Sequence, residues 1–186
     1  MKRKAWIIGA STGIGAAVAD ELAAKGWDVV RSSRSQGEIR IDVSDDASVV
    51  DAANKYQEVH GNFDLVLVMA GFWKRMSAKQ FDLEVFKEHN NTNNVGLARC
   101  VAAVLPKMIN QNSGTLIGVS SVAGFRGLPG SSGYGPSKAA QINFLESLRT
   151  DLQDTNVQIQ TVSPGFVKTP MTDVNTFPMP FIISAE

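Results

Sequence analysis

The chain has 186 residues, carries no net formal charge at pH 7 and is 44% hydrophobic, a composition that suits one domain with a buried core. A neutral chain offers no basic surface for nucleic acid, and no apolar run is long enough to cross a membrane. With one cysteine, Cys100, and two histidines, neither an internal disulfide nor a zinc or other metal site is expected. The apolar run after Met1–Lys4 is too short for a signal peptide. We therefore expect a cytoplasmic protein that forms a single domain over residues 1–186, with Cys100 buried and unreactive.

The first predicted unit is a strand, a glycine loop, a helix and a second strand. Residues 5–9 are apolar, the loop Gly9–Gly15 has the spacing G-x-x-x-G-x-G, a helical pattern ends at Lys25-Gly26, and a strand begins at Asp28. Glycines let the backbone approach a pyrophosphate, and the helix N-terminus offers free N–H groups and a partial positive charge. In this position the loop indicates a dinucleotide site, although its spacing differs from the standard fingerprint.

The second predicted strand ends in Arg31-Ser32-Ser33-Arg34-Ser35, and no acidic residue occurs from Val29 to Gln36. A site for NAD usually has a carboxylate here to bind the ribose 2′-hydroxyl, whereas arginine and serine side chains suit a 2′-phosphate. The alternative is a solvated turn with exposed arginines. The composition of the turn favours NADP over NAD as the cofactor.

Strands and helices alternate along the rest of the chain. Further strands are expected over residues 38–41, 63–69, 115–119 and 157–162. Helices are expected over residues 44–61, 82–108 and 134–154, with loops over residues 72–80 and 122–133. Six strands that alternate with helices predict an α/β fold of three layers, built on one doubly wound parallel sheet.

Two polar stretches each allow two interpretations. Asn90-Asn91-Thr92-Asn93-Asn94 lies inside the predicted helix over residues 82–108, and asparagine is a poor helix former. It marks either a break between two shorter helices or a place where an amide or a loosened backbone holds a water. Trp73, Lys74 and Arg75 either cap the surface or line the mouth of a cleft.

Tyr134 and Lys138 are four residues apart and share one face of a helix. A lysine ammonium favours the phenolate, which predicts a lowered pKa for Tyr134 and proton transfer near neutral pH. Together with Ser121, they can polarise a carbonyl and protonate the alkoxide while a nicotinamide supplies hydride. By spacing alone the pair is more often a surface contact. Ser121 as an acylating nucleophile lacks support, because neither histidine lies near a strand end and no G-x-S-x-G motif occurs.

Taken together, these motifs resemble the classical short-chain dehydrogenase/reductase family over residues 5–172. The residues that match family motifs are Gly9, Gly13 and Gly15, Asp42-Val43, Asn93 with Gly96, Ser121, Tyr134 with Lys138, and Pro164-Gly165 with Thr169. The resemblance implies a Rossmann-type fold with four catalytic residues. In this family Tyr134 would be the acid/base, Lys138 would lower its pKa and hold the ribose, Ser121 would orient the substrate, and Asn93 would position a relay water.

The resemblance also implies a cofactor site. The residues expected to contact NADP are Gly9, Ser11, Gly13, Ile14, Gly15, Ser33, Arg34, Asp42, Val43, Ala70, Gly71, Tyr134, Lys138, Pro164, Gly165, Val167 and Thr169. Arg34 stands where a basic residue selects NADP in this family. The implied activity is hydride transfer between NADP(H) and a carbonyl or secondary alcohol. The alternative is a dinucleotide-binding protein without turnover.

Two features depart from the family pattern. Met69-Ala70-Gly71 replaces Asn-Ala-Gly, which affects local packing more than chemistry. After the apolar segment 170–183, Ser184-Ala185-Glu186 looks like a helix start, and the family's further helix and seventh strand are missing. We therefore expect a shortened chain with a bare apolar sheet edge, and a lid over residues 170–183 that favours a hydrophobic or small neutral carbonyl. A homodimer is expected through the helices near residues 94–108 and 134–154.

Overall fold

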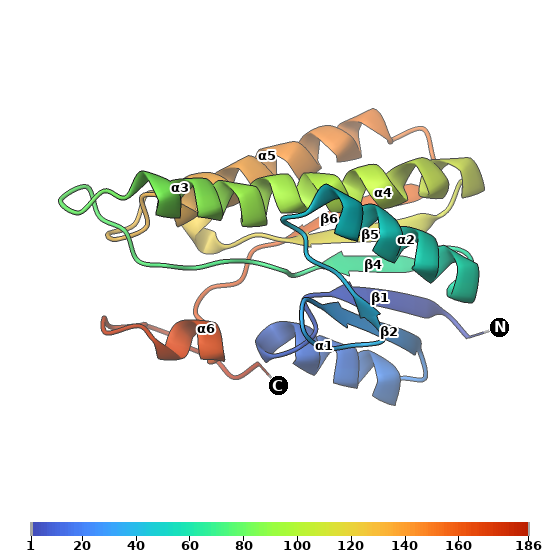
Figure 1. Ribbon diagram of the computed structural model, residues 1–186, viewed down its shortest axis with the longest axis horizontal. Coiled ribbons are helices and arrows are strands. Elements are labelled where there is room, and N and C mark those ends of the chain that lie inside the picture. The colour runs from blue at the N-terminus through green and yellow to red at the C-terminus, as the bar shows by residue number, and fades with distance from the viewer. Residues whose placement is uncertain (1, 186) are drawn as a thin grey trace.

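The computed structural model describes residues 2–185 and contains one sheet of six parallel strands (Figure 1). The strand order is β3-β2-β1-β4-β5-β6, so the chain builds outward from β1 in one direction and then in the other. The strands are β1 (Lys4–Ile8), β2 (Asp28–Ser33), β3 (Ile39–Arg40), β4 (Leu65–Val68), β5 (Gly114–Val119) and β6 (Val157–Val162). The predicted doubly wound α/β fold with six strands is confirmed.

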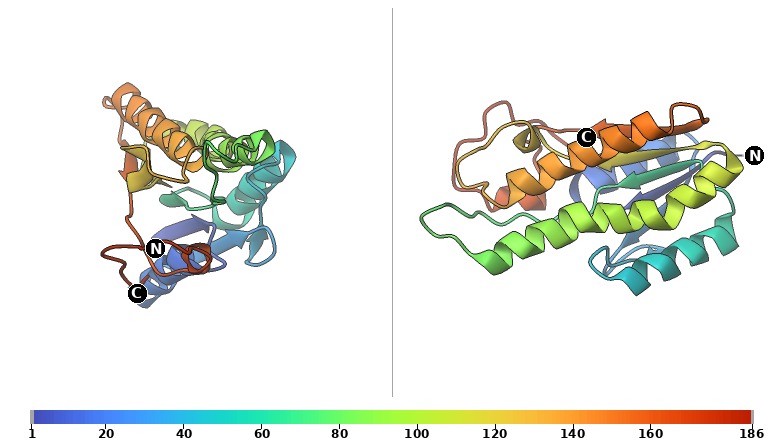
Figure 2. Two further views of the ribbon diagram at one scale, coloured as in Figure 1. Left: turned by 90° about the vertical axis from the view of Figure 1, so that its left-hand side faces the viewer. Right: turned by 90° about the horizontal axis from the view of Figure 1, so that it is seen from above.

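Helices cover both faces of the sheet and complete three layers. The helices are α1 (Gly13–Ala24), α2 (Asp46–His60), α3 (Leu83–His89), α4 (Gly96–Gln111), α5 (Tyr134–Asp151) and the short α6 (Pro170–Asp173). In the view of Figure 1, α2, α4 and α5 lie above the sheet and α1 lies below it. Figure 2 shows the same division from two other directions.

The first strand is buried on both faces, which explains its unbroken apolar sequence. Trp6 and Ile8 belong to the large hydrophobic cluster under α2, α4 and α5, whereas Ala5 and Ile7 belong to the smaller cluster beside α1. The ring of Trp6 stacks on that of Tyr56 with 4.9 Å between centroids. Large buried aromatic side chains contribute strongly to core stability. The centre of the sheet, from which the loops of the candidate site extend, is therefore firmly packed.

The face on which α1 lies is covered unevenly. Ile117 and Val119 of β5 are only half-buried there, and Gln158, Gln160 and Val162 of β6 are exposed. Within residues 2–185, β6 pairs with β5 alone. The edge that we expected to be apolar is therefore exposed in the described chain but carries two glutamines, so it is more polar than predicted.

The helix predicted over residues 82–108 is three consecutive segments. α3 ends at His89, a π-helical segment, η1, runs over Asn90–Val95, and α4 follows. π-Turns are rare and are often found at functional sites. The structure contains both a division into two shorter α-helices and a loosened backbone between them. A water held there stays a prediction.

The segment after β6 turns back on itself. The backbone N–H of Lys168 donates to the carbonyl of Ile183 at 2.9 Å, and the N–H of Ile183 donates to the carbonyl of Phe166 at 3.1 Å. The N–H of Thr169, just before α6, donates to the hydroxyl of Thr172 at 3.0 Å. The predicted lid over residues 170–183 is therefore a loop that is closed at its base.

Candidate active site

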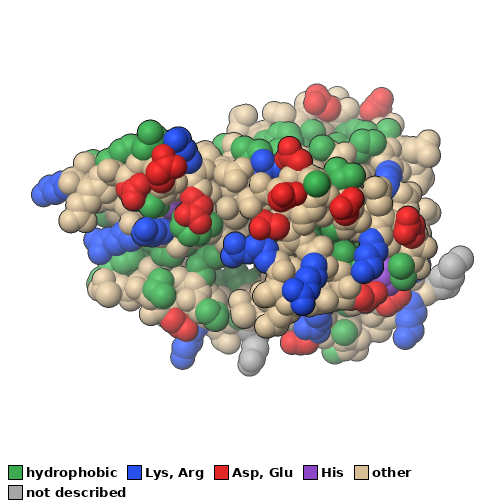
Figure 3. Space-filling view, in the orientation of Figure 1, with side chains coloured by type: hydrophobic (Ala, Val, Ile, Leu, Met, Phe, Trp, Pro, Cys, Tyr) green, Lys and Arg blue, Asp and Glu red, His purple; other side chains and the backbone are tan. Residues whose placement is uncertain are grey.

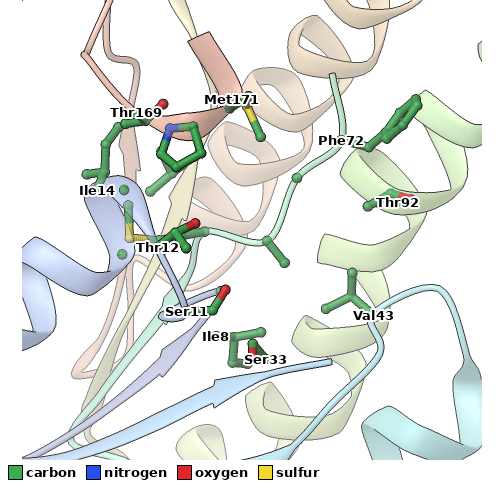
Figure 4. A pocket seen from close by; sticks show the side chains of 18 of the residues that line it. Ile8, Ser11, Thr12, Ile14, Ser33, Val43, Phe72, Thr92, Thr169 and Met171 are labelled. Atoms are coloured by element: carbon green, nitrogen blue, oxygen red, sulfur yellow. The ribbon is translucent and has the colours of Figure 1, made fainter. Parts of the chain in front are cut away.

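A cavity of about 350 Å³ lies at the carboxyl ends of the central strands, and we call it the strand-end cavity. Ligands bind at this edge in doubly wound sheets. All residues that we expected to contact the cofactor line this cavity. Figure 4 shows the side chains of Ser11, Thr12, Ile14 and Thr169 around it. Residues outside the expected set of cofactor contacts also line it, among them Thr12, Ser35, Phe72, Thr92 and Met171.

The glycine loop packs closely against backbone atoms, both its own and those of the loop after β4. Gly9 has a φ of +97°, and a Cβ atom on it would lie 2.5 Å from the backbone nitrogen of Ala70. A Cβ atom on Gly15 would lie 2.1 Å from the carbonyl oxygen of Gly9. Thr12 precedes α1 without capping it through its side chain, and the first turn contains no acidic residue. The free N–H groups at the start of α1 therefore fit the pyrophosphate of a dinucleotide.

Only part of the polar stretch at the end of β2, residues 31–35, is available to a 2′-phosphate. Arg31 pairs with Asp20 at 2.5 Å, and the hydroxyl of Ser32 accepts the indole N–H of Trp6 at 2.8 Å. The hydroxyl of Ser33 donates to the carbonyl of Gln36 at 2.7 Å and accepts its N–H at 2.9 Å. Ser33 thus lines the cavity, but its hydroxyl is held in the turn.

Two exposed residues of that turn, Arg34 and Ser35, line the strand-end cavity. Nearby, Asp42 accepts hydrogen bonds from the hydroxyl of Ser44 at 2.6 Å and from its N–H at 2.9 Å. The bond from the Ser44 hydroxyl is the main cause of a lowered pKa at Asp42, and the charge of Arg34 adds to it. This end of the cavity therefore presents an arginine, a serine and an ionised carboxylate.

Tyr134 is the first residue of α5 and its phenol lies beside Ser121. Burial raises the pKa of Tyr134, and the hydrogen bond with the Ser121 hydroxyl lowers it by less. The sequence predicted a net lowering through Lys138, and the structure differs on this point. The Nζ atom of Lys138 lies 5.5 Å from the centroid of the phenol ring, and its charge is not among the causes of the shift. The phenol is therefore protonated at neutral pH.

Lys138 is almost completely buried, with 4% of its surface exposed. Its ammonium donates to the carbonyl of Val119 and to Oε1 of Gln141, both at 2.9 Å. Burial lowers the pKa of Lys138 to about 7. The position of Lys138 in the wall of the strand-end cavity matches the predicted one, but its contact with Gln141 was not expected.

Asn93 is fully buried in η1 and lines neither of the cavities described here. Its Oδ1 accepts the N–H of Phe72 at 2.7 Å, and its Nδ2 donates to the carbonyl of Phe72 and to the hydroxyl of Ser137, both at 3.0 Å. The side chain therefore ties the loop after β4 to α5. The backbone carbonyl of Asn93 accepts Nε2 of Gln141 at 2.7 Å.

A second cavity, of about 400 Å³, is enclosed by loops and we call it the loop cavity. Most of its lining is apolar, and it includes Trp73 and Arg75, which therefore line a cleft as one interpretation of that stretch expected. Lys74 is exposed and lines neither cavity, so the surface interpretation holds for it. The indole N–H of Trp73 donates to Oδ1 of Asn175 at 2.9 Å, and the guanidinium of Arg75 lies 5.8 Å from the ring centroid of Phe177. The loop before α3 and the lid segment thus meet across this cavity.

The two cavities share a wall. The residues that line both are Ser121, Tyr134, Gly165, Met171 and Thr172. The phenol and hydroxyl that we expected to act on substrate therefore lie where a ligand in one cavity would meet a ligand in the other.

His89 lies closer to the site than the sequence indicated. Its ring is 6.0 Å from that of Tyr134 and 6.3 Å from that of Trp73, measured between centroids. Nδ1 donates to the carbonyl of Val85 at 2.8 Å, and Nε2 accepts the N–H of Lys74 at 3.2 Å. Burial lowers the pKa of His89. With both nitrogens engaged, the neutral ring supports Tyr134 and cannot serve as a base for Ser121.

Three further properties of the described residues concern metal binding, membranes and the thiol. Residues 2–185 contain no group of three or more His, Cys, Asp or Glu side chains that could hold a metal ion, and no helix in that range is long and apolar enough to span a membrane. Cys100 is buried, and burial raises its pKa to about 12, as expected for an unreactive thiol. Acidic and basic side chains both occur over the face shown in Figure 3.

The chain resembles known proteins over its whole length. An "Uncharacterized oxidoreductase" of Myxococcus xanthus is 36% identical in an alignment that covers 99% of this chain and 79% of that protein. The "3-oxoacyl-[acyl-carrier-protein] reductase FabG" of Escherichia coli is 29% identical, with 90% of this chain and 75% of that protein covered.

Solved structures of other proteins are also similar to this chain. "ElxO with NADP Bound" has a TM-score of 0.89 at 26% identity over 100% of this chain and 87% of that chain. "The Closed form of serine dehydrogenase complexed with NADP+" has a TM-score of 0.87 at 28% identity, over 92% and 76%. The family model described as "short chain dehydrogenase" matches residues 3–177, and the protein belongs to that family.

Proposed function

We propose that the protein transfers a hydride between NADP(H) and a carbonyl or secondary alcohol. The observation that carries this proposal is the shared wall, where Ser121 and Tyr134 face both the strand-end cavity and the loop cavity. A dinucleotide in the first cavity and a carbonyl in the second would meet at these two side chains.

The residues around the strand-end cavity suit a bound NADP(H), which would supply or accept the hydride. The backbone of Gly9–Gly15 and the start of α1 would hold the pyrophosphate, and Lys138 would bond the ribose. Tyr134, protonated at neutral pH because burial raises its pKa, would give its proton to the carbonyl oxygen. The hydroxyl of Ser121 would hold that oxygen in place.

The choice of NADP rests on Arg34. It is exposed at the adenosine end of the strand-end cavity, while Arg31 is paired with Asp20. A guanidinium can bond a 2′-phosphate through two N–H groups. Two similar structures contain bound NADP+ or NADP, which agrees with this assignment.

The loop cavity supports a substrate with an apolar body. Its lining includes Leu128, Phe166, Phe177 and Pro178, and Arg75 is its one charged residue within the described chain. The similar Escherichia coli protein is named as a reductase of a 3-oxoacyl group, which contains a carbonyl. We propose a hydrophobic carbonyl compound as the substrate class.

The test is the oxidation of NADPH with a panel of apolar ketones and aldehydes. The Tyr134→Phe variant is expected to lose activity by about 100-fold or more, because proton transfer of this kind contributes about 10²–10⁴-fold. Tyr56→Phe is the matched control, because Tyr56 is the other tyrosine and its buried hydroxyl has no hydrogen-bond partner among the described residues.

Activity that survives Tyr134→Phe would refute the mechanism. Tight NADPH binding by the wild-type protein with no oxidation across the panel would favour the alternative, a dinucleotide-binding protein without turnover.

A further inference from the structure

Gln141 places an uncharged amide deep in the protein between two candidate catalytic residues. It lies one turn after Lys138 on α5 and only 2% of its surface is exposed. Its Oε1 accepts from Nζ of Lys138 at 2.9 Å, and its Nε2 donates to the backbone carbonyl of Asn93 at 2.7 Å. A buried amide is costly without hydrogen bonds, and both bonds described for this one lead to the candidate site.

These contacts settle the direction of the Lys138 ammonium. In its protonated form Lys138 has three N–H groups. One donates to the carbonyl of Val119 and one to Gln141, which leaves one for the strand-end cavity that Lys138 lines. Gln141 and Val119 therefore determine where the third N–H group points.

We propose that Gln141 is a positioning residue for Lys138, and that its carboxamide, which joins Lys138 to Asn93, takes the place of the relay water that the family resemblance assigns to Asn93. This inference rests on the proposed function, since the position of Lys138 matters only if Lys138 takes part in catalysis.

The replacement has a chemical consequence. A water can accept a proton from one neighbour while it donates to another, whereas a carboxamide accepts at oxygen and donates at nitrogen without passing a proton on at neutral pH. The hydrogen-bonded link from Lys138 to Asn93 therefore holds the two residues in place without relaying protons. Protons reach Lys138 and Tyr134 through the strand-end cavity instead.

Few charged groups near Lys138 could stabilise its ammonium in place of the Gln141 oxygen. The groups that face it are the Tyr134 phenol on its own helix, the Val119 carbonyl from β5 and Gln141. The charged residues that share the cavity are Arg34, Asp42 and Glu88. Burial is the sole cause of the lowered pKa of Lys138, so no carboxylate offsets the loss of the Gln141 oxygen.

The kinetic test compares two substitutions of unequal size. Gln141→Leu keeps the volume and removes both hydrogen bonds, and kcat is expected to fall about tenfold with KM for the carbonyl nearly unchanged. Gln141→Ala leaves room for a water with Lys138 and Asn93 as polar partners, and kcat is expected to stay within about threefold of wild type. A merely structural role predicts the opposite order, because the larger cavity costs more stability.

A second readout does not depend on activity. In protein without cofactor, the NMR titration of the ¹³C-labelled ε-carbon of Lys138 is expected to move about one pH unit lower in Gln141→Leu, because the ammonium loses an acceptor. Gln111→Leu is the matched control: its amide also joins backbone segments, with Nε2 bonded to the carbonyls of Phe63 at 2.8 Å and Ser113 at 2.7 Å.

The outcomes separate the two proposals. An unchanged Lys138 titration in Gln141→Leu, or a lower kcat in Gln141→Ala than in Gln141→Leu, overturns the role of Gln141. A shifted titration in a protein that reduces no carbonyl leaves the contact standing and overturns the proposed function. If Gln141→Leu does not fold, Gln141→Met replaces it, because the unbranched side chain adapts to the site while it removes the same two bonds.

Discussion

The strand-end cavity and the loop cavity are of similar volume, but they are built in different ways. The strand-end cavity is shaped by backbone, with Gly9 and Gly15 packed against neighbouring main-chain atoms at the ends of the strands. The loop cavity is shaped by side chains that join loops far apart in sequence, such as Trp73 and Asn175. One half of the candidate site is therefore fixed by the fold, while the other half can vary with the loop residues.

The strongest test of this contrast compares a methyl group added at Gly15, in the wall of the strand-end cavity, with one added at Gly127, next to Leu128 of the loop cavity. In Gly15→Ala the new Cβ would lie 2.1 Å from the carbonyl of Gly9, so we expect a loss of at least about 3 kcal/mol in the free energy of unfolding and loss of NADPH binding. In Gly127→Ala, in the loop before α5, no atom lies within 4 Å of the new Cβ. We expect that variant to stay within about 0.5 kcal/mol of wild type in urea unfolding. Equal losses of stability in the two variants would contradict the difference between the two cavities.

A second test uses the pH dependence of stability that Lys138 creates. Its pKa is about 7 in the folded protein, against an ordinary value of about 10.4 in the unfolded chain, so the unfolded chain binds more protons between these values. The contribution of Lys138 to the free energy of unfolding therefore rises as pH increases from about 7 to about 10, by up to about 4 kcal/mol.

The measurement is the difference in urea stability between wild type and Lys138→Met at several pH values. Lys55→Met, at an exposed position of α2, is the matched control. A difference for Lys138→Met that does not change between pH 7 and pH 10 would show that the lysine is solvated.

The third test concerns the adenosine end of the strand-end cavity. Arg34→Ala is expected to weaken NADPH binding about 10- to 100-fold and to leave NADH binding unchanged, because a charge-assisted hydrogen bond to a phosphate contributes about 1.5–3 kcal/mol. Arg31→Ala is the control, since Arg31 is paired with Asp20 and does not line the cavity. Fluorescence titration measures both cofactors. Equal losses for NADPH and NADH would argue against a 2′-phosphate contact.

The smallest effect is expected in the loop cavity. Trp73→Phe removes the hydrogen bond to Asn175 and keeps a ring next to Tyr134, where the centroids are 5.0 Å apart. We expect KM for the carbonyl to rise about two- to fivefold, since one such bond contributes about 1 kcal/mol, with the NADPH affinity unchanged. In a double-mutant cycle with Asn175→Leu the two effects should not add. Additive effects would show that the two residues act independently.

The sequence predicts the sheet and the strand-end cavity well, because both are shaped by the backbone. Apolar runs such as Leu65–Val68 predicted the strands. The position of the glycine loop between a strand and a helix predicted the strand-end cavity. These features depend on local patterns and on the rule that parallel strands end at one edge of a sheet.

Contacts between distant side chains were not predictable in the same way. Gln141 reads as one more residue of a helix, and its bond to Asn93 depends on how α5 packs against η1.

Arg31 and Arg34 look alike in sequence, and only the pairing of Arg31 with Asp20 separates their roles. Trp73 and Asn175 are 102 residues apart, so no local pattern could join them. The raised pKa of Tyr134 arises from burial, which spacing alone does not reveal.

The wall that the two cavities share has a thermodynamic consequence. Five residues form part of both linings, so a ligand that shifts any of them changes the shape offered to the other ligand. Linkage then requires reciprocity: whatever factor NADPH contributes to the affinity for a carbonyl, the carbonyl contributes to the affinity for NADPH. Met171 and Thr172 in the lid belong to this wall, and through them the occupancy of one cavity would be communicated to the other.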